Sequence, residues 1–273
     1  MTTATLATPT SSNGGRVTQA RVIESEWIKL RSLRSTLWSF VAAAVFIIGL
    51  GVLFTSFRAN TLNSGQIVGD FSFDATQVSL RGIFLAQLAI GVLGVMAVTG
   101  EYSTGMIRAT LSAVPRRLPV LWAKLAVFAG VVFVLMLAST FIAFELGQSI
   151  LSSTHHQASL SSPGALRAIV GGALYLAILA MLGVGLGFLV RNTGGAIASL
   201  FGLLLILPVL AQALPGHWAG DVWKYLPMPA GTSITGTLQD PSLLSPWTGL
   251  GVFSLYAVAA VGAGAVMLKR RDA

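Results

Sequence analysis

Residues 37–57 read LWSFVAAAVFIIGLGVLFTSF, an apolar run without a single charged residue. An α-helix rises about 1.5 Å per residue, so roughly 20 apolar residues cross the hydrocarbon core of a bilayer. The run is 21 residues long by this numbering. It therefore predicts a helix that spans a membrane.

Five further apolar stretches follow along the chain. The six predicted spans are about 37–57, 81–100, 119–146, 168–190, 196–214 and 248–268. A short polar turn rich in glycine, 191–195, separates the fourth span from the fifth, so these two are expected to be antiparallel neighbours. We predict an all-α membrane protein in which residues 37–273 form one domain of six transmembrane helices.

The composition supports this class. The 273 residues are 54% hydrophobic and 10% charged, whereas soluble domains carry roughly 25% charged residues. The mean hydropathy is +0.79. The chain has no cysteine, which excludes disulfides and thiolate metal sites. In a membrane protein, the net charge of +8 indicates loops that face the cytoplasm and anionic lipid, and no nucleic acid partner is predicted.

The placement of lysine and arginine predicts the orientation. With the N-terminus inside, all of the 17 basic residues but four fall on the inner side of the predicted spans. The four on the outer side are Arg58, Arg81, Arg167 and Lys224. Cytoplasmic loops are enriched in these residues, so both termini are predicted to be cytoplasmic.

Two segments precede the first span. Residues 1–15 are rich in Ser, Thr and Ala and are expected to be a disordered tail, and no cleavable secretory signal is recognised. Residues 16–36 predict an interfacial elbow helix, because apolar residues recur at helical spacing with acids early and bases late. Such a helix can anchor the chain in the headgroup plane, contact a cytoplasmic partner, or do both.

The segment between the second and third spans reads GEYSTGMIR over residues 100–108. It is too polar for lipid and too short to fold alone, and Tyr102–Leu111 predicts a short helix bounded by Gly100 and Pro115. Spacing alone favours an ordinary positively charged inner loop. The alternative is a stiff helix, joined to two spans, that transmits a push from a cytoplasmic partner.

This segment, continued through Pro115-Arg116-Arg117 to Lys124, resembles the permeases of type-2 ABC exporters, a family that includes drug, polysaccharide and lipid exporters. Members follow the second span with Glu-Tyr/Phe, a small residue, Gly-Thr/Met-Ile and a later Pro-x-Arg. Residues 24–32, ESEWIKLRS, resemble the start of the same family, and the likeness extends to the six-span layout. The resemblance implies that 101–111 include a coupling helix that docks on an ATPase.

The family further implies the partners. Two permease copies, or this chain and a related one, would pair in a cell membrane above a cytoplasmic ABC ATPase dimer, and the Ala/Gly/Arg-rich composition indicates a bacterium. ATP and magnesium would bind the ATPase, and this chain would hold no cofactor. Glu101 and Arg108 are expected to make the docking contact, since a carboxylate and a guanidinium pair well across an interface. The full predicted docking set is Glu26, Lys29, Glu101, Tyr102, Thr104, Met106 and Arg108.

The resemblance also implies an outer re-entrant helical hairpin before the sixth span, where residues 215–227 fit. Trp218, Trp223 and Tyr225 in this stretch predict either an outer gate or an interfacial loop, because Trp and Tyr favour the membrane interface.

The enzyme question is decided by what the sequence lacks. It contains no G-x-x-x-x-G-K-[ST] phosphate loop, and its three histidines lack metal-ligand spacing, so no catalytic, cofactor or metal site is predicted. The few charges within the spans favour export of a hydrophobic or amphiphilic cargo such as a drug, antibiotic, lipid or peptide. The alternatives are a secondary transporter, which usually has ionisable residues at mid-membrane, a membrane-embedded enzyme, and a non-transporting immunity or anchor protein.

Overall fold

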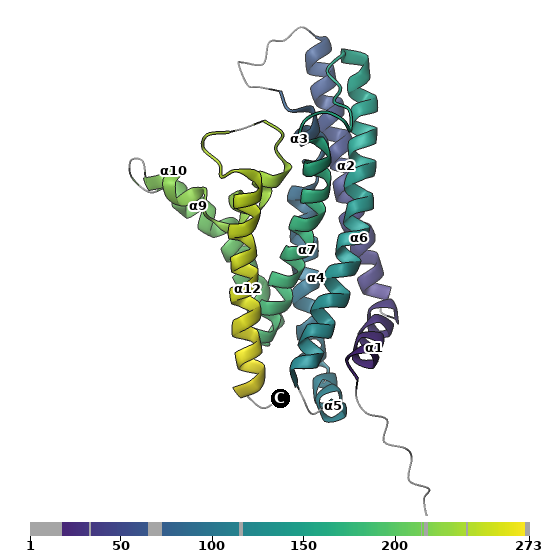
Figure 1. Ribbon diagram of the computed structural model, residues 1–273, viewed down its shortest axis with the longest axis vertical. Helices are drawn as coiled ribbons and strands as arrows, with labels where there is room; N and C mark the ends of the chain where they lie inside the picture. The colour runs from purple at the N-terminus through teal and green to yellow at the C-terminus, as the bar shows by residue number, and fades with distance from the viewer. Residues whose placement is uncertain are drawn as a thin grey trace, which may run out of the picture.

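The structure is a computed structural model that describes residues 18–32, 34–64, 73–114, 117–213, 215, 218–238 and 240–270. Every regular element in these ranges is helical (Figure 1). The helices of the bundle are α1 (Gln19–Ser32), α2 (Arg34–Asn63), α3 (Ala75–Ser79), α4 (Ile83–Ser103), α5 (Met106–Ala113), α6 (Arg117–Leu151), α7 (Ala165–Val190) and α12 (Pro246–Arg270). The predicted tail 1–15 lies outside the described residues.

Six helical stretches are long and apolar enough to cross a membrane, which confirms the predicted number. They are Arg34–Asn63, Ile83–Ser103, Arg117–Thr154, Ala165–Val190, Thr193–Gln212 and Pro246–Arg270. The first and third are longer than the apolar runs that predicted them, and α2 and α6 rise together at the top of Figure 1. A helix continues where backbone hydrogen bonding continues, so it does not end where its side chains turn polar.

Helix α7 is the centre of the bundle and packs against α4, α6 and α12. Glycines permit this contact: a Cβ atom added at Gly183 would lie 2.6 Å from the carbonyl oxygen of Gly91, and one at Gly185 would lie 2.7 Å from the amide nitrogen of Val261. Both distances are too short for any side chain. The glycines of the predicted fourth span therefore pack helices within this chain.

The fifth span is assembled from three pieces. These are α8 (Thr193–Phe201), a π-helical turn (Gly202–Ile206) and α9 (Leu207–Gln212). Pro208 has no N–H to donate, and the amide of Leu207 before it bonds back to the carbonyl of Gly202, five residues earlier. The distortion at Pro208 takes the form of a wider turn, after which α9 and α10 (Trp218–Trp223) lean away from the bundle (Figure 1).

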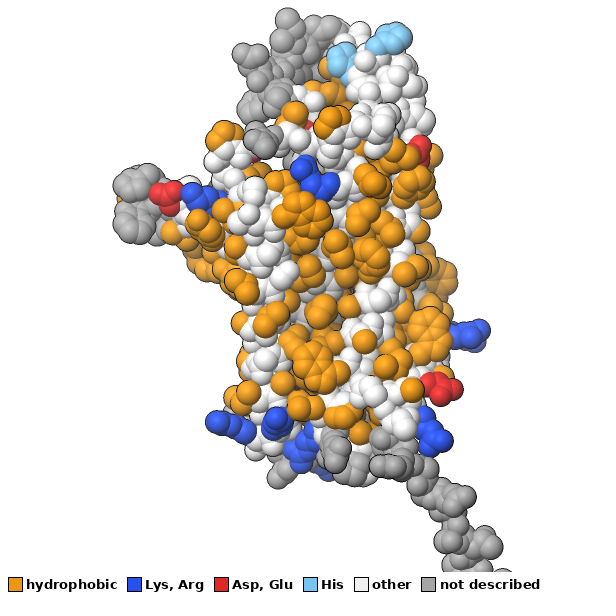
Figure 2. Space-filling view, viewed as in Figure 1, with side chains coloured by type: hydrophobic (Ala, Val, Ile, Leu, Met, Phe, Trp, Pro, Cys, Tyr) orange, Lys and Arg blue, Asp and Glu red, His pale blue; other side chains and the backbone are white. Residues whose placement is uncertain are grey.

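The chain returns to the bundle through α11 (Pro227–Thr232), which packs against α12, and the 3-10 turn Ser233–Thr235. We call the end formed by α1, α5 and the last turns of α4 and α12 the inner end, because the sequence predicts that it faces the cytoplasm. The opposite end, with α3 and residues 233–238, is the outer end. Lys and Arg side chains gather at the inner end, at the bottom of Figure 2, and hydrophobic side chains cover the flank above them.

Candidate functional site

The segment after the second span forms a break and a short helix at the inner end. Tyr102 and Ser103 are the last residues of α4, and Gly105 then adopts φ of 73° before α5 begins at Met106. This left-handed conformation is readily adopted only by glycine, and it ends one helix and starts the next. The predicted helix Tyr102–Leu111 is therefore wrong at its start, since α5 spans Met106–Ala113.

Helix α5 has one buried side and one open side. Ile107 is buried against the bundle, whereas Arg108 is exposed and the side chain of Met106 is 51% exposed. Thr110 is half-buried and faces inward to accept a hydrogen bond from Lys29. The helix is thus held from one side, and its other side is available at the end of the molecule.

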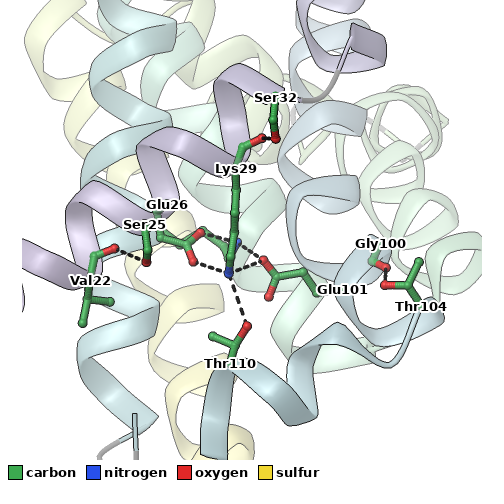
Figure 3. A network of polar contacts seen from close by, with 10 residues as sticks. Val22, Ser25, Glu26, Lys29, Ser32, Gly100, Glu101, Thr104 and Thr110 are labelled. Atoms are coloured by element: carbon green, nitrogen blue, oxygen red, sulfur yellow. Dashed lines mark hydrogen bonds and ion pairs between the residues drawn. The ribbon is translucent and has the colours of Figure 1, made fainter. Parts of the chain in front are cut away.

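Four charged side chains from three helices form a closed cluster behind α5, which we call the ion-pair ring. Its members are Glu26 and Lys29 of α1 and Glu101 of α4, which Figure 3 labels, together with Lys124 of α6. Lys29 Nζ lies 2.7 Å from Glu26 Oε1 and 3.1 Å from Glu101 Oε1. Lys124 Nζ lies 2.6 Å from Glu26 Oε2 and 2.8 Å from Glu101 Oε1. Lys29 also donates to Thr110 Oγ1 at 3.3 Å, which joins α5 to the ring.

Three members of the ring are buried and Lys29 is half-buried, and the charges of the four balance. The exposed fraction is 4% for Glu26, 5% for Lys124 and 8% for Glu101. Buried charges are costly unless they pair with good geometry, and two carboxylates against two ammonium groups meet that condition. Burial alone lowers the pKa of Lys29, but the hydrogen bond and charge of Glu26, followed by those of Glu101, outweigh it and raise the pKa above its usual 10.5.

The structure sorts the predicted docking residues into three groups. Glu26, Lys29 and Glu101 meet in the ring, while Thr104, Met106 and Arg108 lie on the exposed side of the α4–α5 junction. Thr104 donates its hydroxyl hydrogen to the carbonyl of Gly100 at 2.8 Å, which closes the last turn of α4.

Tyr102 forms the third group, beside Arg191 at the C-terminal end of α7. The Arg191 guanidinium carbon lies 5.2 Å from the centre of its ring. Arg191 donates to the carbonyl of Met267 at 2.9 Å, and Arg117 donates to that of Leu268 at 3.1 Å. These two arginines bind the last carbonyls of α12, where a helix end attracts positive charge.

A cavity of about 330 Å³ lies beside the ring, between α1, α2, α4 and α6. The four residues of the ring form the charged part of the cavity wall. The apolar side chains of the wall are those of Leu30, Leu93, Met96, Ala97, Met106, Val127 and Phe128. The cavity is therefore amphiphilic, with charge next to the inner end and apolar side chains beyond it.

Sequence reasoning missed Lys124 as a member of the site. It lies near the start of the third span and was not in the predicted docking set, yet its ammonium points into the protein toward Glu26 and Glu101. One available signal was the Glu26–Lys29 pair, spaced three residues apart on one helix face. A lysine inside a span also needs a carboxylate partner.

The predicted outer gate residues lie far along the chain from this site, on α10 and the turn after it. The side chain of Trp218 is outside the described residues. Tyr225 is 48% exposed, and its carbonyl accepts a hydrogen bond from the hydroxyl of Tyr256 at 3.2 Å. Trp223 is half-buried at the end of α10. Their role as a gate stays a prediction.

Within the part of the chain that the structure describes, no group of three or more His, Asp or Glu side chains is placed to hold a metal ion. A family model described as ABC-2 family transporter protein matches residues 22–208. The match begins in α1, includes the ion-pair ring and α5, and ends in α9. Among curated proteins, none matches the chain.

Proposed function

The chain belongs to the ABC-2 transporter family, and on that premise we propose that it is the permease subunit of an exporter driven by a separate ATPase chain. It is a multi-pass membrane protein with six candidate spans and a membrane component of transport. The proposed ATPase is a cytoplasmic ABC dimer that holds ATP and magnesium. The proposed cargo is hydrophobic or amphiphilic, since few charged groups lie within the spans.

The proposal rests on the way α5 is attached to the rest of the bundle. One face of this helix is exposed at the inner end, and the other is fixed to three helices through the ion-pair ring and Thr110. A push on the exposed face reaches α1, α4 and α6 together, because the ring joins them with short, buried contacts. This is the mechanical requirement for a helix that couples an ATPase to membrane spans.

We assign the predicted docking residues two proposed roles. Met106 and Arg108, with Thr104 beside them, lie on the exposed side and are proposed to contact the ATPase. Glu26, Lys29 and Glu101 are proposed as positioning residues that hold α5 at its angle, because their charged groups are turned toward one another inside the protein.

A second permease, either a copy or a relative of this chain, completes the proposed exporter in a bacterial plasma membrane. Closure of the ATPase dimer would press on α5 and α1 of each permease. The spans of the two permeases would then shift about their common axis and open an outward path. Exposed apolar side chains along α2, such as Leu53 at 60%, suit contact with lipid or with the partner permease.

The test is co-purification with the ATPase chain encoded beside this one, from detergent, after co-expression. Arg108→Ala is expected to weaken capture roughly tenfold, because a charged residue near the centre of an interface often contributes more than 1 kcal/mol. Arg270→Ala, an exposed arginine at the same end but on α12, is the matched control and should leave capture unchanged.

Two outcomes would redirect the proposal. If both arginine variants capture the ATPase like the intact chain, the exporter assignment survives and the docking face must lie elsewhere. If no ATPase carrying a phosphate loop is captured by any form, the secondary-transporter and membrane-anchor alternatives take precedence.

A further inference from the structure

The cavity beside the ion-pair ring has the size and polarity of a ligand site. Its volume of about 330 Å³ falls at the lower end of the roughly 300–1,000 Å³ typical of small-molecule sites. Leu93, Val127 and Phe128 are buried and form its apolar floor. Glu101 and Lys124 lie at the charged end of the same wall. An occupant must therefore present a polar group to the ring and an apolar body to the floor.

Nearly all N–H donors of the two ring lysines already have a hydrogen-bond acceptor. An ammonium group has three N–H donors, and Lys29 directs its three toward Glu26, Glu101 and Thr110. Lys124 directs two toward Glu26 and Glu101. The acceptor side is incomplete, because the Oε2 oxygen of Glu101 has no hydrogen-bond partner among the described residues. A buried carboxylate oxygen without a donor is costly.

Hydroxyl groups of the cavity wall add to this excess of acceptors. A hydroxyl has one hydrogen to donate and two lone pairs to accept. Three hydroxyls of the wall already donate to a carbonyl of their own chain segment, so their lone pairs remain as acceptors. They belong to Ser32, Ser39 and Thr104, which donate to the carbonyls of Lys29, Ser35 and Gly100 at 2.9, 3.0 and 2.8 Å.

We propose that this cavity binds an amphiphile whose headgroup carries a primary ammonium, with its N–H groups directed to Glu101 and its chain lying on the apolar floor. The unpartnered oxygen of Glu101 suits such an ammonium, and the phosphate of a zwitterionic headgroup would lie near Lys124, which directs only two of its three N–H groups to carboxylates. The ligand comes either from the membrane, as a lipid with an ethanolamine headgroup, or from the cargo, as a cationic amphiphile. Only the cargo source rests on the proposed function.

The experiment is native mass spectrometry of the full chain in detergent, with three dioctanoyl lipids offered at equal concentration. Phosphatidylethanolamine is expected to bind about tenfold better than the others, because hydrogen bonds to charged groups are stronger than those between neutral groups. Phosphatidylcholine keeps the positive charge without N–H donors. Phosphatidylglycerol keeps the phosphate without the ammonium. Equal binding of the three lipids would overturn the proposal.

Two alanines of α4 supply the matched variants. Ala97 lines the cavity, Ala89 does not, and both are partly buried against the same hydrophobic core. Ala97→Phe fills the cavity and is expected to abolish the preference for phosphatidylethanolamine, whereas Ala89→Phe should retain it. Retention in Ala97→Phe would place binding elsewhere on the protein and overturn the site.

Glu101→Gln tests the headgroup contact, because it replaces the unpartnered oxygen by an amide of the same shape. The preference for phosphatidylethanolamine over phosphatidylcholine should fall toward equality in this variant. If Glu101→Gln does not fold, the Ala97 and Ala89 pair still decides the location of the site.

Dodecylammonium, added as a competitor, distinguishes the two sources. Displacement of phosphatidylethanolamine supports a site open to single-chain cationic amphiphiles and therefore to cargo. Retained phosphatidylethanolamine supports a resident lipid. These measurements need no ATPase, so a failure here is separate from a failure of ATPase capture.

Discussion

Different interactions hold the helices together at the two ends of the bundle. At the inner end, charged side chains from α1, α4 and α6 pair with one another in a ring. At the outer end, side chains bind backbone groups: Asp74 accepts from the amides of Thr237 and Leu238 at 2.6 and 3.3 Å, and Arg167 donates to the carbonyl of Gly236 at 2.6 Å.

Gln148 of α6 extends the outer pattern. Its amide nitrogen donates to the carbonyl of Ala75 at 3.2 Å and to the hydroxyl of Ser79 at 2.9 Å, and its oxygen accepts from the amide of Ala158 at 2.7 Å. The outer side chains thus contact neutral partners, and all of these except the hydroxyl of Ser79 are backbone groups of α3 or of a loop.

The difference predicts different responses to change. In the ring each charge depends on the others, so the loss of one leaves the remainder unbalanced in a buried place. Outer bonds to the backbone do not share a charge balance, and each can be lost separately. Because the ion pairs of the ring depend on one another, they suit the inner end, which is proposed to receive motion from an ATPase. The independent hydrogen bonds of the outer end suit a part of the bundle that stays fixed.

Lys124→Met is expected to have the largest effect. It leaves two buried carboxylates against one lysine, and removal of one partner from a buried ion pair costs about 3 kcal/mol of unfolding free energy. The measurement is thermal and denaturant unfolding in detergent, followed by circular dichroism. The double variant Lys124→Met/Glu101→Gln should recover part of the loss, because it removes the unbalanced charge. A double variant as unstable as the sum of both single changes would refute a coupled ring.

Asp74→Ala is expected to cost about 2 kcal/mol, from the loss of a helix cap and of two backbone bonds. Asp74 Oδ1 caps α3 by accepting from the amide of Gln77 at 2.9 Å, and its other oxygen holds residues 237 and 238. Combined with Lys124→Met, its effect should add to within about 0.5 kcal/mol, since distant sites are independent. A strongly non-additive effect of the two substitutions would show that the interactions at the two ends are not independent.

The smallest expected effect concerns alkaline pH. The folded pKa of Lys29 is raised above 10.5, so its pairing contributes stability that is complete below that pH and is lost as the pH rises through the folded pKa. The intact chain should lose about 1 kcal/mol or less above about pH 10.5, because Lys29 is partly exposed. Lys29→Met should lack this component when unfolding is measured from about pH 9 to about pH 11.

Lys224→Met is the matched control for the alkaline measurement. The Lys224 side chain is 28% exposed, close to the 26% of Lys29, and it too pairs with a carboxylate three residues away, that of Asp221. This variant should follow the pH dependence of the intact chain. A Lys29→Met profile parallel to that of the intact chain would place the alkaline loss outside the ring.

Local patterns predicted more of the fold than of the site. The six spans followed from apolar length, and the exposed basic residue of α5, Arg108, lay in the segment singled out by its motif. The boundaries were less accurate: the predicted elbow 16–36 contains α1, which spans Gln19–Ser32, and α2 already begins at Arg34. Propensity does not show where a turn such as the one at Gly105 separates two helices.

The sequence by itself determined that this protein belongs in a membrane, how many helices cross it, and that its basic residues gather on one side. These properties depend on the hydropathy and charge of residues that are close in sequence, so they can be predicted without knowing which helices are in contact. Only the tertiary structure decided that Lys124 pairs with Glu26, which lies 98 positions earlier. Such a pair depends on how α1 packs against α6, just as the close approach of α4, α7 and α12 depends on glycines such as Gly183 and Gly185.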